Sequence, residues 1–115
     1  MKLILALLVA TGLTACGSDP NKEVTTKLTR FADGGFGLVM IADFTITNNT
    51  GHPVKDIEVK CTGYSETGTK IDQNTRTIYK VIQPGKTIKV SGFNMGYVAS
   101  AVHRESCGTI KYTGA

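Results

Sequence analysis

The segment Lys55–Tyr64 alternates apolar and polar side chains with a period of two residues. The odd-numbered positions include Ile57, Val59 and Cys61, and the even-numbered positions between them are Asp56, Glu58 and Lys60. Because successive side chains of a β-strand point to opposite faces, this pattern predicts a strand with one buried and one solvated face. Cys61 is then in phase with the core. Asp56 and Glu58 are expected on a charged outer face rather than as a catalytic carboxylate pair.

Similar segments recur along the chain, separated by turns of Gly, Asn and Pro, and no persuasive amphipathic helix interrupts them. The expected strands are Val24–Phe31, Gly37–Asn48, Lys55–Tyr64, Lys70–Ile82, a segment around Ile88 and Val90 that could include Phe93, and Cys107–Tyr112. Gly37–Asn48 begins with a continuous apolar stretch, which we expect to be buried on both faces. Short strands with turns every 8–12 residues or so predict an all-β protein. The expected fold is a small antiparallel immunoglobulin-like β-sandwich of about six or seven strands, in residues 24–115.

The start of the chain has a different character. The first fifteen residues, MKLILALLVATGLTA, place Lys2 before the unbroken apolar run Leu3–Val9. The run is too short to span a bilayer, which takes about 20 residues. A charged start, a short apolar core and small residues near a cleavage site are typical of a secretory signal peptide, and a short buried helix of the domain is the alternative. We therefore expect residues 1–15 to be a signal peptide.

Leu13-Thr14-Ala15-Cys16 resembles the lipobox of bacterial lipoproteins. The resemblance implies cleavage before Cys16, a diacylglycerol thioether on its sulfur and acylation of the new amino group. Two or three acyl chains make a stable membrane anchor, whereas one chain would be marginal. Gly17, where an Asp would favour the inner membrane, implies an outer-membrane location, with the domain in the periplasm or on the cell surface. Residues 16–23 are then a lipidated N-terminus and tether.

With Cys16 lipidated, Cys61 and Cys107 remain as a pair. Because the periplasm is oxidising, we expect a disulfide between them, and two separate buried thiols are the alternative. A metal site is not expected, because the chain has no C-x-x-C motif and His52 and His103 lie far apart in the sequence. We expect no cofactor.

A second resemblance covers Phe44–Phe93, with the segments FTITNNTGHPVKDIEVKCTGYSETGTKI and IQPGKTIKVSGF. This part of the chain resembles the FxLYD-like β-sandwich modules of bacterial envelope proteins. It departs from their pattern at Tyr64-Ser65, which replaces an aromatic-acidic pair, and in the added Cys61. The resemblance implies a binding or scaffold unit without a shared active site, so it indicates a fold more than a function.

The formal net charge is +4 at pH 7, but the basic residues alternate with acidic ones, as in VKDIEVK, and form no cluster. We therefore expect no nucleic-acid partner. HRESC, His103–Cys107, gathers several reactive residue types, and an enzyme using His103 and Glu105 is one hypothesis. Proximity in sequence is not catalytic geometry, so we favour a polar connection into the last strand and expect no enzyme.

The segment GFNMGYVASA, Gly92–Ala101, mixes large apolar with small residues outside any clear strand pattern. From Asn94 to Ser106 we expect a loop, or one or two helical turns around Val98–His103. Four of its residues are candidates for contact with a partner: Phe93, Met95, Tyr97 and Val98. The favoured alternative is a loop that plugs one end of the sandwich.

These observations predict a non-enzymatic, outer-membrane-anchored lipoprotein whose domain binds another envelope protein. The alternative is a phage- or plasmid-borne exclusion or inhibitor lipoprotein that blocks a receptor or a lysozyme-like enzyme.

Overall fold

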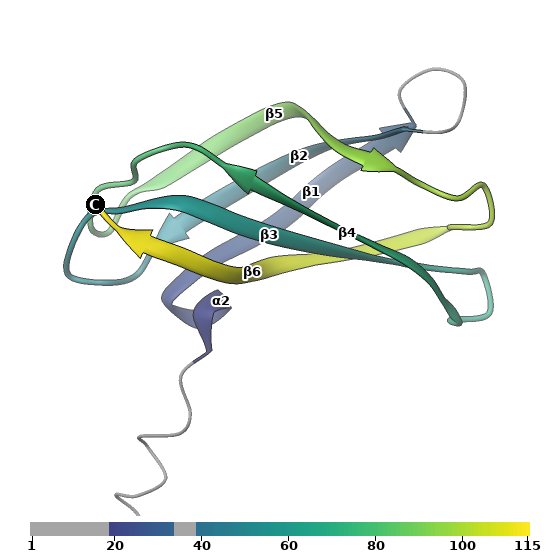
Figure 1. The fold of residues 1–115 in the computed structure, drawn as a ribbon, viewed down its shortest axis with the longest axis horizontal. Helices are drawn as coiled ribbons and strands as arrows, with labels where there is room; N and C mark the ends of the chain where they lie inside the picture. The colour runs from purple at the N-terminus through teal and green to yellow at the C-terminus, as the bar shows by residue number, and fades with distance from the viewer. Residues whose placement is uncertain (1–18, 34–38) are drawn as a thin grey trace, which may run out of the picture.

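The computed structural model describes residues 19–33 and 39–115. These residues form two antiparallel three-stranded sheets that pack face to face (Figure 1). The strands are β1 (Val24–Asp33), β2 (Val39–Asn48), β3 (Val54–Tyr64), β4 (Lys70–Ile78), β5 (Thr87–Tyr97) and β6 (Arg104–Gly114), and a short helix, α2 (Pro20–Glu23), precedes them. The prediction of an all-β antiparallel sandwich is confirmed.

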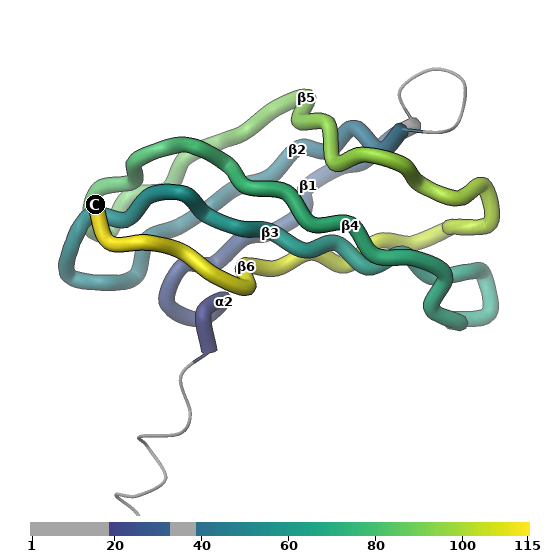
Figure 2. Tube along the Cα trace, in the orientation of Figure 1, coloured from purple at the N-terminus to yellow at the C-terminus, as the bar shows by residue number. Residues whose placement is uncertain are grey.

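One sheet has the order β1-β2-β5 and the other the order β4-β3-β6. β1–β2 and β3–β4 are consecutive pairs, whereas β5 and β6 return to pair with β2 and β3. Four strands therefore lie at sheet edges, and across the sandwich β1 lies beside β6 and β4 beside β5 (Figure 2). The two central strands, β2 and β3, carry most of the core.

The core consists of inward side chains from both sheets. Its fully buried members are Val24, Met40, Ala42, Phe44, Ile46, Val54, Ile57, Val59, Cys61, Ile78, Ile82 and Met95. β3 has the predicted alternation, with Ile57, Val59 and Cys61 buried and the intervening polar residues half-buried on the outer face. β2 differs from its prediction, because burial alternates from Val39 to Asn48 and its apolar first half is covered on one face only. Gly37 and Leu38 lie outside the described residues.

The strand boundaries differ from the prediction mainly in the second half of the chain. β5 continues through the segment predicted as a loop, to Tyr97, with Gly92 and Gly96 at positive φ (63° and 99°). Glycine adopts these angles without a Cβ penalty, so the strand absorbs two irregularities that break its sequence pattern. β4 ends at Ile78, and Ile82 makes only an isolated bridge to Val54.

The predicted tether is wrong for Pro20–Glu23. Asp19 caps α2, its side chain accepting a hydrogen bond from the N–H of Asn21 at 3.0 Å, and Pro20 occupies the first turn. The helix then packs against β6, where the Tyr112 hydroxyl donates to the Glu23 carboxylate. The folded domain therefore includes α2 as well as residues from Val24 onward.

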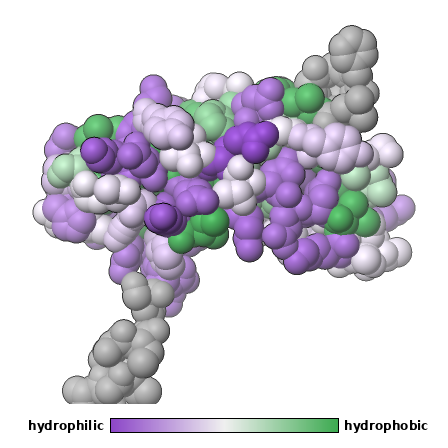
Figure 3. Space-filling model, in the orientation of Figure 1, coloured by the Kyte–Doolittle hydropathy of each residue, from purple (hydrophilic) through white to green (hydrophobic). Residues whose placement is uncertain are grey.

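The face drawn in Figure 3 is mostly hydrophilic, with hydrophobic side chains in separate patches. The exposed large apolar residues are Ile71, Tyr79, Val81, Tyr97 and Ile110. Single exposed apolar residues of this kind are ordinary on a folded surface. They do not by themselves mark a binding site.

Candidate functional site

A hollow lies between edge strands of the two sheets, β1 and β6. We call it the β1–β6 groove, and its volume is about 580 Å³. Its lining includes several hydroxyl-bearing residues, one basic and one acidic side chain: Asn21, Thr25, Thr26, Lys27, Leu28, Thr29, Glu105, Ser106 and Cys107. Pockets of several hundred Å³ are large enough for a small ligand or a short stretch of peptide. This groove is therefore the candidate site.

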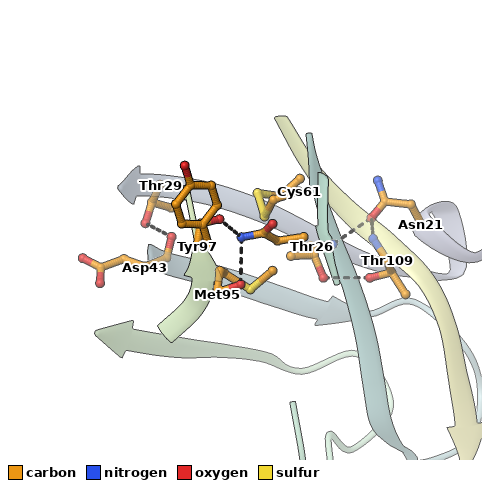
Figure 4. The surroundings of a disulfide bond; sticks show 10 residues. Asn21, Thr26, Thr29, Asp43, Cys61, Met95, Tyr97 and Thr109 are labelled. Atoms are coloured by element: carbon orange, nitrogen blue, oxygen red, sulfur yellow. Dashed lines mark hydrogen bonds between the residues drawn. A yellow bond between two sulfur atoms is a disulfide. The ribbon is translucent and has the colours of Figure 1, made fainter. Parts of the chain in front are cut away.

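Asn21 closes one end of the β1–β6 groove. Its side-chain oxygen accepts hydrogen bonds from the backbone N–H of Thr26 on β1, at 3.0 Å, and of Thr109 on β6, at 2.9 Å. Below it, the hydroxyls of Thr26 and Thr109 share a hydrogen bond of 2.7 Å, and both residues are buried (Figure 4). One amide oxygen thus joins the edges of two sheets that no ladder connects.

Replacing Asn21 with Ala should lower the free energy of unfolding by about 1–3 kcal/mol, because two part-buried N–H groups lose their acceptor. Hydrogen exchange at the Thr26 and Thr109 amides should become faster, while the amides of β3 keep their protection. Asn21→Asp is the matched control, because it keeps an acceptor oxygen and should retain most of the stability. Unchanged exchange at both amides in Asn21→Ala would contradict the role given to this side chain.

The Cys61–Cys107 disulfide forms part of the groove wall. Cys61 and Cys107 stand directly opposite each other on β3 and β6, with their Cα atoms 4.0 Å apart. Cys61 is buried, whereas Cys107 is half-buried and reaches the groove. The predicted disulfide is confirmed. Cys61 lies on the buried face of β3, as the alternation of the sequence predicts.

Among residues 19–33 and 39–115, one group of three residues of metal-binding type was found: Cys61, Glu105 and Cys107. Both sulfurs are joined in the disulfide, and a metal requires thiolates. The group therefore offers a metal one carboxylate in this state, which is too few protein ligands for a structural zinc site.

Glu105 lies beside a second carboxylate. Gly63 on β3 pairs with Asp72 on β4 and with Glu105 on β6, so the three residues form one row across the sheet. A Cβ at position 63 would lie 2.6 Å from Asp72 Oδ1 and 2.9 Å from Glu105 Oε2, so the two acidic side chains occupy the space that glycine leaves. Partial burial, with a smaller contribution from the Asp72 charge, raises the pKa of Glu105 to about 7.

This raised pKa predicts a pH-dependent stability. Between about pH 4.5 and 7 the folded state holds a proton on Glu105 that the unfolded chain has released, so stability should fall as pH rises through this range. Because the carboxyl is half-exposed and screened by solvent, we expect an effect of about 1 kcal/mol. Glu105→Gln should remove this slope and be the more stable protein at pH 8. Urea unfolding at pH 5, 6, 7 and 8 tests this pH dependence, with Glu66→Gln in an exposed turn as the control. Equal slopes of stability against pH in wild type and Glu105→Gln would contradict it.

The HRESC segment reaches the groove with three of its five residues. Glu105, Ser106 and Cys107 line the groove, whereas His103, just before β6, and Arg104 are exposed outside it. Arg104 lies over the ring of Tyr64, with its guanidinium carbon 4.5 Å from the ring centroid. Because the Cys107 sulfur is in a disulfide, it offers no thiol nucleophile. The structure therefore brings together neither a Cys–His pair nor the suggested His103–Glu105 pair as a formed hydrogen bond.

The four residues suggested for partner contact have different surroundings. Met95 is fully buried and Val98 is 8% exposed, so neither offers a surface. Phe93 is half-buried and its ring packs at a tilt against Phe44, with centroids 6.3 Å apart. Tyr97 alone is well exposed, at 61%. The prediction of surface contact is wrong for both Met95 and Val98. β5 continues through Met95 and turns it inward, and Val98, the first residue after the strand, is also buried.

Asn21 and Asp72 are not among the residues that the sequence patterns predict for a site. Asn21 was assigned to a polar tether, and the one feature that indicates otherwise is the Asp19-Pro20 pair, which is typical of a helix start. Asp72 reaches Glu105 through the register of two strand pairs, which single-strand patterns do not define. Cys16 and Gly17, the residues of the predicted anchor, lie outside the described residues.

No family model, no curated protein and no solved structure matches this chain. Within the described residues, no helix is both long enough and apolar enough to pass through a membrane.

Proposed function

We propose that the protein is an exported lipoprotein, anchored to the outer membrane through Cys16, whose β-sandwich is a non-enzymatic binding module of the cell envelope. The lipobox-like Leu13–Cys16 supports the anchor. The Cys61–Cys107 disulfide supports an oxidising compartment outside the cytoplasm. The β1–β6 groove supports a binding role, since it combines a formed hollow with a few polar groups.

The observation that carries the proposal is the short length of chain between Cys16 and the start of the folded domain at α2. Asp19, the cap of α2, is three residues after Cys16, and three extended residues span at most about 11 Å. The α2 end of the sandwich would therefore be held close to the membrane surface. Asn21 places the closed end of the groove at this same end. The groove would begin near the membrane and open away from it.

The non-enzymatic part of the proposal rests on the chemistry of the groove. Its one carboxylate, Glu105, has Asp72 as its acidic neighbour, and its cysteine is oxidised. A nucleophile–base pair held by a third, orienting group does not occur among these lining residues. The lining offers hydroxyl, amide and backbone groups, which suit binding.

Cell fractionation tests the anchor. The wild-type protein should appear in the outer-membrane fraction, and Cys16→Ser should leave that fraction, either as soluble protein or as uncleaved precursor in the inner membrane. Gly17→Asp should move the lipidated protein towards the inner membrane, and Ser18→Ala is the matched control that should change nothing. Wild type and Cys16→Ser found in the same fraction would contradict the proposal.

A further inference from the structure

The β1–β6 groove is bordered by two strand edges whose backbone groups face it. β1 and β6 are the end strands of their sheets, and an end strand presents a row of N–H and C=O groups without ladder partners. The Asn21 side-chain oxygen accepts a hydrogen bond from one such N–H group on each strand, that of Thr26 on β1 and that of Thr109 on β6. This oxygen stands where the carbonyl of an inserted strand would stand.

The register of β6 fixes which groups come next. The Thr109 N–H points to Asn21 and thus away from β3. In an antiparallel ladder every second residue directs its N–H and C=O to the same side, and no register shift occurs between Thr109 and Arg104. The N–H groups of Cys107 and Glu105 therefore face the groove. Outside the strand ladders, no hydrogen bond from either group is found within residues 19–33 and 39–115.

Beyond Asn21, β1 and β6 do not run side by side. A register shift between Leu28 and Arg30 marks a bulge, and bulges bend the strand that carries them. Figures 1 and 2 show β1 and β6 diverging from the end where α2 lies. From Thr109 to Glu105 the free edge of β6 covers about 13 Å of strand. This length matches a short extended segment of polypeptide.

We propose that the β1–β6 groove binds one extended polypeptide segment of another envelope protein, as an added strand on the free edge of β6, with a Lys or Arg side chain of that segment against Glu105. Backbone groups spaced two residues apart along an open edge are the recognition chemistry of strand addition. The inference rests on the binding part of the proposed function and is independent of the lipid anchor.

Charge complementarity supports a basic residue in the bound segment. The carboxylates of Asp72 and Glu105 lie together, and the only ion pair found in the described part of the chain joins Arg30 and Asp43 elsewhere. A cation entering the groove would offset the repulsion and the partial burial that disfavour the ionised Glu105. A second copy of this chain fits less well, because its edge strands belong to a packed sandwich and cannot enter between β1 and β6 as a single strand.

Nuclear magnetic resonance of the full protein in detergent micelles tests the inference. The probes are three soluble nine-residue peptides of alternating Thr and Val that differ only in the central residue, which is Lys, Ser or Glu. The amide resonances of Glu105 and Cys107 should shift on titration, and the Lys peptide should bind about fivefold more tightly than the Glu peptide, as expected for one partly screened ion pair.

Two variants separate the backbone contribution from the charge. Glu105→Pro removes an outward N–H from an edge strand, where proline is tolerated, and should abolish binding of all three peptides. Glu105→Gln keeps the N–H and should bind the Lys and Glu peptides with similar affinity. Thr75→Pro, at an outward position on the edge of β4, is the matched control and should bind as wild type does.

Four results would overturn the inference: no shift with any peptide, binding that survives Glu105→Pro, shifts caused only by a trisaccharide of N-acetylglucosamine, or self-association through β6 without peptide. Each of these four results can be observed whether or not Cys16 carries lipid. Failure of the anchor would instead appear in the fractionation of Cys16→Ser. The two proposals therefore fail in different experiments.

Discussion

The double variant Cys61→Ala/Cys107→Ala should be about 4 kcal/mol less stable than the oxidised wild type. The disulfide links residues 46 apart in the sequence, so its main effect is to restrict the unfolded chain. Small domains are stable by 5–15 kcal/mol or so, and a loss of this size is a large part of the total. Guanidinium unfolding of the two proteins measures it, with the change in midpoint and slope recorded together.

The bond also holds an edge strand to a central one. β6 pairs with β3 alone, so the disulfide fixes the register of the strand that carries Glu105. Ser106→Ala, which removes only an exposed hydroxyl between Cys107 and Glu105, is the control for stability and should stay within about 0.5 kcal/mol of wild type. A double variant as stable as the oxidised protein would contradict the structural role of the bond.

Phe44→Ala should cost about 3–5 kcal/mol, because it removes the largest fully buried side chain and leaves a cavity between the sheets. Phe44 lies on the central strand β2, is 1% exposed and packs against the ring of Phe93. Tyr79→Ala is the matched control: Tyr79 is 78% exposed, so its truncation should change stability by less than about 0.5 kcal/mol.

Urea unfolding of both variants at one pH measures the difference. Similar losses in Phe44→Ala and Tyr79→Ala would contradict the placement of the core between β2 and β3. A loss in Phe44→Ala alone supports it. Leu28→Ala gives an intermediate case, because Leu28 is half-buried beside the core.

The sequence was sufficient for the fold class because one face of each central strand is buried. The period of two in Lys55–Tyr64 assigns Ile57, Val59 and Cys61 to the core without knowledge of the neighbouring strands. The disulfide followed from the number of cysteines left after Cys16. Their placement directly opposite each other on β3 and β6 depends on strand register, which the pattern of either strand leaves open.

The errors have identifiable physical causes. β5 carries two glycines at positive φ, which break the alternation, so the segment around Met95 was predicted as a loop. Polar residues dominate Asp19–Glu23, so apolar patterns do not predict the docking of α2 through the Asn21 side chain. The Asp72–Glu105 row brings together residues from the two strands that flank β3. The role of Gly63 between them depends on the strand register, which the sequence pattern does not define.

Lipid attachment at Cys16 is the central claim, because it sets where the domain works and which end of the groove lies near the membrane. The direct measurement is the intact mass of the protein extracted from the membrane fraction, combined with the mass of its N-terminal peptide. We expect a chain that starts at Cys16 and carries a diacylglycerol group with at least one further acyl chain. A chain that still starts at Met1, or one that starts at Cys16 without acyl mass, would contradict the account.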